Sequence, residues 1–411
     1  MPENQVPTGA ISPIPATAPS QSVQAVPAQP VSIPTVSTPA PAQVSPAIQV
    51  PDDAEKYLEM LFDLMVKYDS SDIYLTYGEE PSIRIFGETK RLQGVPKLDD
   101  KALNGFADFM MNDEDRRNYE ANLAADLGIS MKGRRYRVNV SRQRDHMMIV
   151  ARLLEEKVPT IDERHLPQIF KQLIQKTNGV IFMVGPTGSG KSTSLAAMVE
   201  EINMTKAKHI ITIEDPIEYI FEPKKSIFEQ KQLGKDITSF GSAMKYALRQ
   251  RPDVILFGEI RDTESVRNAI ALAETGHLVM TTIHSRSAEQ AVNKIISMFP
   301  ADEQPQIRNQ LSENMTAIIV QKLIRKVDGS GMVPAHEILL NNIAVENTIR
   351  ENKLNQIKNV MYTNRNIGMQ LLEDHLATLA EQGLITPEQA MSNANDLDHV
   401  KREMQSKGVQ F

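Results

Sequence analysis

The second half of the chain alternates apolar, strand-like runs with amphipathic helical patterns. Residues 180–184 form a short, wholly apolar run, as expected of a buried strand. After it, apolar residues recur with the spacing of one helix face: Leu195, Met198, Val199 and Ile202. Three more apolar runs follow at intervals, with the sequences HIITIED, DVILFGEI and HLVMTTIH. Strands that alternate with helices predict an α/β domain, in which helices cover the faces of a parallel sheet.

We expect this α/β domain to cover residues 168–411 and to be mainly helical from about residue 302 to the end. Residues 155–167 are polar, contain two prolines and are interpreted as a linker. Before them, the pattern over residues 52–154 predicts a small α+β domain. Its first helix has one apolar face, a second helical pattern covers about residues 100–125, and strand-like runs lie between and after them.

Residues 1–51 are predicted to be a disordered tail. They are rich in Pro, Ala, Ser, Thr, Val and Gln, and they contain no aromatic residue. The prolines remove backbone donors, and the segment cannot bury enough apolar surface to offset the entropy lost on ordering. A docking arm is the alternative to a passive tail, which is the interpretation that we favour.

Composition narrows the possible functions. A net charge of −7 over 411 residues argues against a surface dedicated to coating DNA or RNA. The chain has no cysteine, which excludes disulfides, thiolate zinc sites and a cysteine nucleophile, and which suits the cytoplasm. No run approaches 18 consecutive apolar residues, and the N-terminus lacks the basic start of a secretory signal. We therefore expect any role at a membrane to act through a partner.

A glycine-rich loop joins the strand at residues 180–184 to the helix that follows it. The loop matches the phosphate-binding P-loop pattern G-x-x-x-x-G-K-[ST], and the flanking strand and helix make a chance turn the weaker alternative. Glycines let the backbone approach an anion, and a helix N-terminus directs N–H groups at it. We expect Lys191 to contact the β- and γ-phosphates and the Ser192 hydroxyl to ligate Mg²⁺. The predicted nucleotide-binding residues are Gly185, Pro186, Thr187, Gly188, Ser189, Gly190, Lys191, Ser192 and Thr193.

Two carboxylate sites follow apolar strands of the same domain. Glu214 and Asp215 come after HIITI, with Glu218 nearby, and Glu259 comes after VILFG. Ligands of open parallel sheets bind beyond the carboxyl ends of the strands, so both sites are expected to face the triphosphate. We assign Glu259 to water activation or Mg²⁺ organisation, and Glu214 to positioning of water and metal. Either site alone is most simply an exposed loop acid, and the coincidence of two favours function.

Arginines and histidines elsewhere have several interpretations. The arginines between residues 134 and 152 have three interpretations. They belong to solvated strand faces, they form a weak nucleic-acid surface with Tyr136 as its one aromatic residue, or they act as arginine fingers that contact the γ-phosphate.

His277 and His284 flank an apolar run at an odd spacing, so a shared metal site is improbable. Each is either a packed histidine or a sensor of the γ-phosphate.

Four motifs resemble, in order, those of the secretion-type hexameric ATPases. GPTGSGKST, TIEDPIEY, PDVILFGEIRD and ETGHLVMTTIH are similar to the Walker A, Asp box, Walker B and His box of that family. The resemblance extends from about residue 55 to the C-terminus. Within the family, the stretches IRNQLSENMTAIIVQKLI, AHEIL and GMQLLED resemble the PilT branch, the ATPases that retract type IV pili.

The resemblance implies a PAS-like N-terminal domain, a RecA-like C-terminal domain and a homohexamer that hydrolyses ATP with Mg²⁺ to drive pilus retraction and twitching motility. It also implies a cytoplasmic location at the inner-membrane base of the pilus machine. An inner-membrane platform protein and a paralogous retraction ATPase are the implied partners, without nucleic acid and without insertion into the membrane. The implied catalytic residues are the Asp-box acid Glu214, the Walker B glutamate Glu259, the His-box histidines His277 and His284, and the arginine pair Arg137 and Arg152.

One departure from the branch concerns its C-terminal retraction motif, A-I-R-N-L-I-R-E. In the matching stretch, residues 344–351, Glu346 replaces the first arginine, which leaves open whether the chain acts as PilT or as its paralogue PilU. A pilus-assembly or type II secretion ATPase is a second alternative, although such relatives often carry a four-cysteine motif that is missing here. A RecA-like nucleic-acid motor is disfavoured by the net charge, and a non-hydrolysing scaffold by intact Lys191, Glu214 and Glu259.

Overall fold

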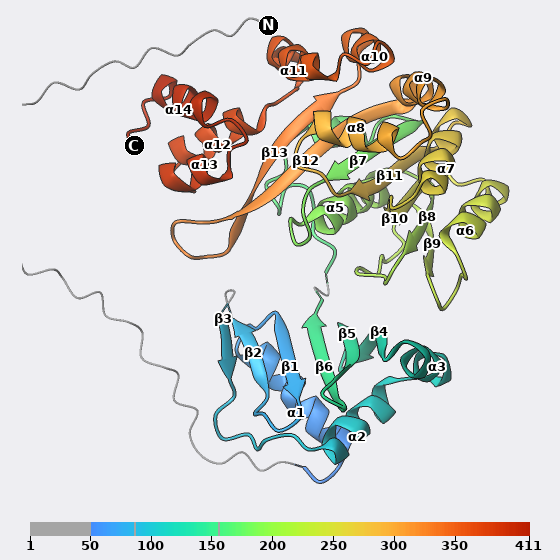
Figure 1. The fold of residues 1–411 in the computed structure, drawn as a ribbon, viewed down its shortest axis with the longest axis vertical. Helices are drawn as coiled ribbons and strands as arrows, with labels where there is room; N and C mark the ends of the chain where they lie inside the picture. The colour runs from blue at the N-terminus through green and yellow to red at the C-terminus, as the bar shows by residue number, and fades with distance from the viewer. Residues whose placement is uncertain (1–50, 86–87, 155–156) are drawn as a thin grey trace, which may run out of the picture. The chain divides into compact units, whose positions relative to one another are not determined.

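The computed structural model describes residues 51–85, 88–154 and 157–411 (Figure 1). The predicted tail, apart from Pro51, lies outside these residues. Within the described chain, no helix combines the length and the apolar character needed to cross a bilayer. The strands described here form two sheets, one of six strands and one of seven.

The six-stranded sheet is antiparallel throughout, in the order β3-β2-β1-β6-β5-β4. Its strands are β1 (Asp72–Thr76), β2 (Ser82–Ile85), β3 (Glu88–Arg91), β4 (Ala124–Met131), β5 (Arg134–Gln143) and β6 (His146–Leu153). Three helices share a core with it: α1 (Ala54–Lys67), α2 (Asp100–Met110) and α3 (Asp113–Asn122). Helices and strands are thus mixed in this region, as the sequence predicted.

The local sequence explains where these helices start. The Asp53 side chain accepts a hydrogen bond from the backbone N–H of Lys56 and so caps α1, whose buried face carries the predicted apolar residues. The helical pattern expected over about residues 100–125 is confirmed, and it is divided into the two helices α2 and α3. Asn112 and Asp115 form a reciprocal capping box, which ends α2 and starts α3.

The seven-stranded sheet has the order β13-β12-β7-β11-β10-β8-β9, and every neighbouring pair in it is parallel except β12 with β13. Its strands are β7 (Gly179–Val184), β8 (His209–Glu214), β9 (Ile227–Gln232), β10 (Val254–Glu259), β11 (Leu278–Ile283), β12 (Met315–Arg325) and β13 (Met332–Leu340). The associated helices are α4 (Ile169–Leu173), α5 (Lys191–Thr205), α6 (Phe240–Ala247), α7 (Thr263–Glu274), α8 (Ala288–Ser297) and α9 (Gln304–Asn314). The α/β class predicted from the alternation is confirmed.

Strand register brings the expected functional segments to one edge of this sheet. In the pairing of β7 with β11, Val184 lies opposite Ile283, and in that of β10 with β8, Phe257 lies opposite Ile213. Glu214 and Glu259 therefore end β8 and β10, and the P-loop and His284 follow β7 and β11, so all four lie at the carboxyl ends of neighbouring parallel strands.

The expectation of a mainly helical region after residue 302 was wrong for residues 315–340. These residues form the long hairpin β12–β13. Most of β12 is buried because it pairs with β7 on one side and β13 on the other, and a near-continuous apolar sequence fits such a strand as well as it fits a buried helix.

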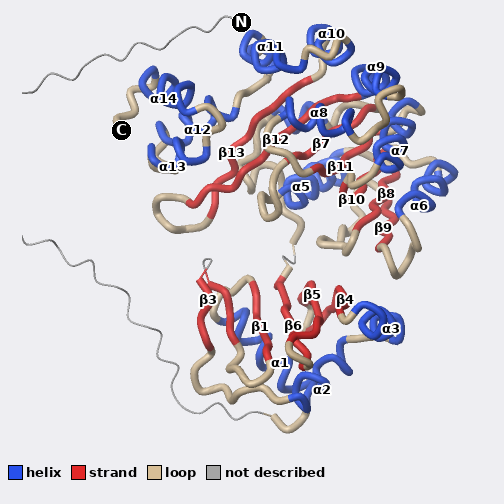
Figure 2. Tube along the Cα trace, viewed as in Figure 1, coloured by secondary structure: helices blue, strands red, loops and turns tan. Residues whose placement is uncertain are grey.

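The remaining chain is helical, as predicted, and comprises α10 (Ile343–Arg350), α11 (Ile357–Thr363), α12 (Leu372–Glu381), α13 (Pro387–Asn393) and α14 (Leu397–Ser406) (Figure 2). Helices α12, α13 and α14 form a small bundle. It has its own apolar cluster, which also includes Ile324 of β12 and Val333 of β13. The hairpin, which forms one edge of the sheet, therefore connects the sheet to this C-terminal bundle.

Candidate active site

The P-loop follows β7 and ends where α5 begins. Gly185 has a φ of 152°, and a Cβ at that position would lie 2.4 Å from the backbone oxygen of Gln321. Gly190 is the N-cap of α5 in the left-handed conformation, with a φ of 80°. Both positions thus require glycine, and they turn the chain so that the N-terminus of α5 opens into the loop.

Lys191, the first residue of α5, is buried and folds back over the loop. Its Nζ donates hydrogen bonds to the carbonyl oxygens of Gly185 and Pro186, at 2.9 and 2.8 Å. Burial lowers the pKa of this ammonium, while the negative charges of Glu259 and Glu218 oppose the shift. The lysine is therefore held at the loop by carbonyl dipoles and by two carboxylates of the same site.

Glu259 is linked to the P-loop through His284. The Glu259 Oε1 atom lies 3.1 Å from His284 Nε2, and His284 Nδ1 lies 3.0 Å from the carbonyl oxygen of Gly185. Both ring nitrogens face oxygen atoms, so the ring is held between the carboxylate and the loop. The other carboxylate oxygen of Glu259 accepts a hydrogen bond from Arg261 Nε at 3.0 Å. Glu259 and His284 are thus fixed beside the loop.

Glu214 and Ser192, the two predicted metal ligands, line one small cavity. It measures about 40 Å³ and also includes Tyr219 and Thr282. Burial of the Glu214 carboxyl raises its pKa to about 7. Its Oε1 atom is buried without a hydrogen-bond partner among the described residues. A carboxylate oxygen and a hydroxyl on one cavity are suitable ligands for Mg²⁺, so the residues present fit that ion.

His277 lies apart from this group. It precedes β11, and its Nδ1 contacts the carbonyl oxygen of Leu272 at 2.9 Å and the Thr275 hydroxyl at 3.1 Å. His284 follows the same strand, so the two histidines stand at opposite ends of β11. The structure brings only His284 to the P-loop, and the contacts of His277 stabilise the turn between α7 and β11.

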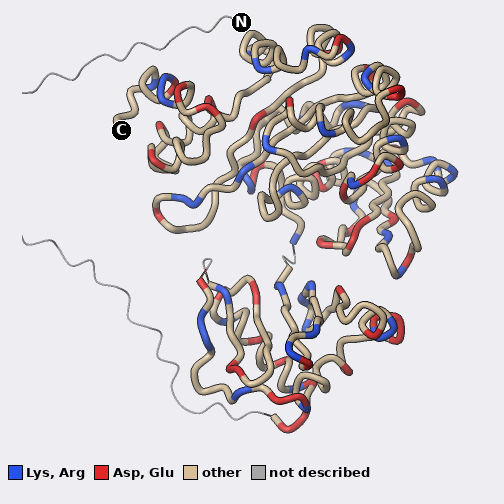
Figure 3. The backbone as a smooth tube through the Cα atoms, in the orientation of Figure 1, with Lys and Arg blue, Asp and Glu red and all other residues tan. Residues whose placement is uncertain are grey.

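Arg137 and Arg152 form a cross-strand pair in the six-stranded sheet. They lie directly opposite each other on β5 and β6, so their side chains share one face. Arginines recur along β5, where Figure 3 shows several basic positions. Arg152 Nε also donates to the carboxylate of Asp72, which lies opposite it on β1, at 2.8 Å, and this contact orients the guanidinium.

Sequence analysis missed two polar residues that contact the P-loop. The Tyr219 hydroxyl donates to Thr193 Oγ1 at 3.2 Å, and the Gln321 side chain donates to the Ser189 carbonyl at 2.7 Å. Tyr219 ends the TIEDPIEY motif, but nothing in the spacing singles it out. The signal for Gln321 was a lone amide within the apolar run AIIVQKLI.

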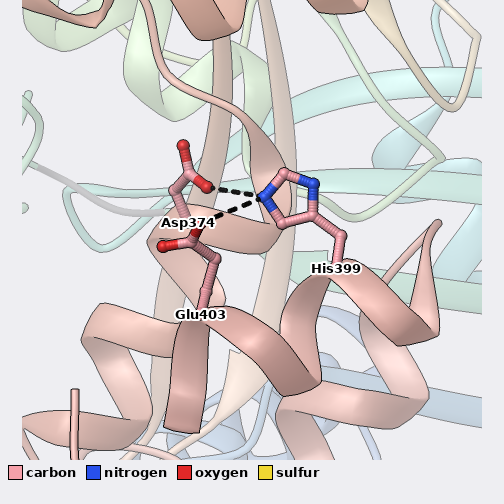
Figure 4. A group of neighbouring side chains, drawn as sticks. All are labelled: Asp374, His399 and Glu403. Atoms are coloured by element: carbon pink, nitrogen blue, oxygen red, sulfur yellow. Dashed lines mark hydrogen bonds and ion pairs between the residues drawn. The ribbon is translucent and has the colours of Figure 1, made fainter. Parts of the chain in front are cut away.

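A second group of possible metal ligands, Asp374, His399 and Glu403, lies between α12 and α14 (Figure 4). The His399 ring contacts both carboxylates, at 3.1 and 3.4 Å. Arg365 already supplies a positive charge here, because it donates to Asp374 at 2.5 Å and to Glu403 at 3.3 Å. We interpret the group as an ion-pair network that ties α12 to α14 and not as a metal centre.

Comparison with known proteins assigns the chain to a family. The family described as "Type II/IV secretion system protein" matches residues 52–411. The chain belongs to this family.

Relatives in the type II/IV secretion system protein family match most of the chain. A "Twitching motility protein" of Neisseria gonorrhoeae is 42% identical over 77% of this chain and 84% of its own length. The "Type IV pilus ATPase PilU" of Pseudomonas aeruginosa is 38% identical over 84% of this chain and 90% of its own length. The crystal structure titled "Pilus Retraction Motor PilT and Bound ADP" is 40% identical, has a TM-score of 0.76, and covers 83% of this chain and 98% of its own. The predicted family and the predicted enzyme class, an ATPase, are confirmed.

Proposed function

We propose that this chain is an ATPase motor that retracts type IV pili and so drives twitching motility. The observation that carries the proposal is the joining of the P-loop, His284 and Glu259 into one contact chain at the carboxyl edge of the sheet. Membership of the family and the names of its relatives supply the biological context.

The residues around the loop divide the work of ATP binding. N–H groups at the start of α5 face the phosphates, and Lys191 exchanges its carbonyl contacts for phosphate oxygens. Ser192 and Glu214 would hold Mg²⁺ from their shared cavity. The ion would supply positive charge that offsets the negative charge of the triphosphate. Gly188 and the other loop glycines keep side chains out of the path of the triphosphate.

Glu259 positions and activates the attacking water. Its carboxylate is only 24% exposed and is oriented from both sides, by His284 and by Arg261. A carboxylate held in this way can accept the proton of water while remaining in one geometry. The His284 ring contacts the Gly185 carbonyl oxygen and the Glu259 carboxylate. It therefore holds that carboxylate at a fixed position relative to the P-loop. Glu214 assists by fixing the metal and the water.

We further propose the division into domains and the assembly. Residues 52–154 are a PAS-like domain, residues 155–167 a linker and residues 168–411 a RecA-like ATPase domain. Arg137 and Arg152 contact the γ-phosphate as the arginine pair, since their cross-strand placement lets both reach one anion. Six copies form a cytoplasmic ring at the inner-membrane base of the pilus, and the ring passes domain motion to a platform protein.

A PilU-like accessory role is the second candidate. It is favoured by Glu346, whose carboxylate lies 3.9 Å from Arg350 one turn later in α10. The resemblance implies an arginine at this position, so the charge presented by this helix face is reversed. Pilus coupling, and not hydrolysis, is the property that this residue changes.

The test measures ATPase activity against oligomer size for the wild type and for Glu259→Gln, using the full chain. We expect a hexamer-linked activity that Glu259→Gln abolishes while ATP binding is retained. Glu313→Gln, which changes an exposed carboxylate on α9, is the matched control and should hydrolyse ATP normally. Normal hydrolysis by Glu259→Gln would refute the assigned role. An inactive, well-formed wild-type hexamer would favour the accessory role.

A further inference from the structure

Three sequence stretches that resemble the PilT branch meet in the structure, and apart from the contact of Gln321 with Ser189 they have no role in the site described so far. Gln321 belongs to the first and lies on β12, next to the P-loop. His336 belongs to the second and lies directly opposite Gln321 on β13. The third stretch, residues 368–374, leads into α12, and His375 follows it. Figure 1 shows β12 and β13 running from beside β7 to the C-terminal bundle.

The Gln321 side chain uses both ends of its amide. Its Nε2 donates to the Ser189 carbonyl oxygen at 2.7 Å. Its Oε1 accepts from the Ser194 hydroxyl at 2.7 Å and lies 3.0 Å from His336 Nε2. A carbonyl oxygen can only accept, so the Ser189 contact fixes which way the amide points, and His336 must then donate from Nε2. Gln321 thereby joins the P-loop, α5 and β13 while only 2% exposed.

His336 continues the chain of hydrogen bonds to the bundle. Its backbone N–H donates to His375 Nδ1 at 2.9 Å, and its carbonyl oxygen accepts from Gln370 Nε2 at 3.0 Å. Burial lowers the pKa of the His375 imidazole to about 4, and it lowers that of His336 as well. Both rings are therefore neutral at physiological pH, as this pattern of donors and acceptors requires.

Movement at His375 is expected to move the whole bundle. Asp374, its neighbour in α12, is paired with His399 of α14 (Figure 4). Arg365 bridges the same two helices through Asp374 and Glu403. A shared apolar cluster also packs the three helices together. The bundle is thus bonded to the hairpin at His336 and tied internally by charges.

We propose that Gln321 is a positioning residue of the P-loop and that Gln321, His336 and His375 couple nucleotide binding to helices α12–α14. This inference rests on the proposed function, because it requires a nucleotide at the P-loop. A shift of Ser189 must either move the Gln321 amide or break a buried hydrogen bond. Leaving buried polar groups unpaired costs more than moving them together, so the network transmits the shift.

The same contacts would exist in a merely static scaffold, so the test must measure a response to nucleotide. Hydrogen exchange of residues 372–406 is followed in the full chain with and without ADP, together with the Kd of ADP. We expect ADP to slow exchange of these residues about fivefold, the effect of one neutral hydrogen bond. Coupling is reciprocal, so His375→Phe, which keeps the ring but removes the acceptor, should abolish the slowing and raise the Kd by the same factor.

Two further variants make the test specific. Gln321→Leu should also remove the response of residues 372–406, although exchange of α5 still slows with ADP. Thr281→Val is the matched control, since Thr281 is buried in β11 with a hydroxyl that has no hydrogen-bond partner among the described residues. It should retain the response. The inference is overturned if ADP binds without slowing exchange in the bundle, or if His375→Phe responds like the wild type. Failure of the wild type to bind ADP would refute the proposed function and the inference together.

Discussion

Replacing the Glu214 carboxyl by an amide should stabilise the fold while removing activity. The structure raises the pKa of this carboxyl from its ordinary 4.5 to about 7, because its charge is buried in the cavity beside Ser192. A raised pKa means that the folded state holds the proton more tightly than the unfolded state does. The contribution to stability is therefore fully present below about pH 4.5 and is lost as the pH rises through about 7.

The size of this effect follows from the shift. Each pKa unit corresponds to about 1.4 kcal/mol, so the wild type loses about 3 kcal/mol by pH 8 at the upper limit. The Glu214→Gln variant has no titrating group there. We expect its unfolding free energy to exceed that of the wild type by about 2 to 3 kcal/mol more at pH 8 than at pH 5. Turnover of ATP should fall sharply at pH 8, where the wild-type carboxyl is ionised, because the amide cannot hold Mg²⁺ as a carboxylate does.

Urea unfolding followed by circular dichroism at the two pH values measures this difference. Glu222→Gln, at a nearby exposed carboxylate, is the control and should change the unfolding free energy equally at both. Saturating Mg²⁺ with ADP should erase the pH-dependent advantage of Glu214→Gln, since the cation stabilises the ionised wild-type carboxyl. An advantage that is equal at pH 5 and pH 8, or that is absent at pH 8, would refute the claim that a buried charge is being titrated.

Three other predictions test neighbouring parts of the structure. Gly185→Ala should lower stability by about 1–3 kcal/mol and weaken ATP binding, because its Cβ would lie 2.4 Å from the Gln321 backbone oxygen; thermal unfolding and nucleotide titration measure both effects. His284→Phe should lower kcat and leave the KM for ATP nearly unchanged, because it removes the contact that orients Glu259 and does not alter Lys191. A raised KM with normal kcat would contradict this. Arg365→Gln should speed hydrogen exchange in α12 and α14 and leave that of α5 unaltered, because it removes the guanidinium that pairs with Asp374 and Glu403 and leaves these carboxylates only the His399 ring.

Most of the site could be predicted because its residues are close to strand ends. The P-loop is contiguous in sequence, and the carboxyl ends of parallel strands meet at one edge, which places Glu214, Glu259 and His284 without knowledge of the strand order. His277 has the same residue type and a similar motif position, yet it precedes β11 and so lies at the other end. The sequence already shows that the two histidines flank one apolar run, and this is enough to place them at opposite ends of the strand.

The contacts of Gln321 could not be predicted, because they depend on register between distant segments. Val320 pairs with Val184 only after a register shift near the start of β12, and this alignment places the next residue against the P-loop. The hairpin itself was missed because its apolar run satisfies strand and helix patterns equally. The break between α2 and α3 was in principle readable, since Asn112 followed by Asp115 has the spacing of a capping box.

The fold-back of Lys191 has a consequence for how product leaves. The ammonium donates to two loop carbonyl oxygens at 2.9 and 2.8 Å. These oxygens take the place that phosphate oxygens occupy when a nucleotide is bound. Each contact that the lysine makes with a nucleotide replaces one that it already has, and net affinity is the difference between the two sets. When ADP dissociates, the lysine recovers its internal partners and is not left uncompensated. Such a loop favours rapid exchange of spent nucleotide over tight retention, which is what a machine that cycles under load requires.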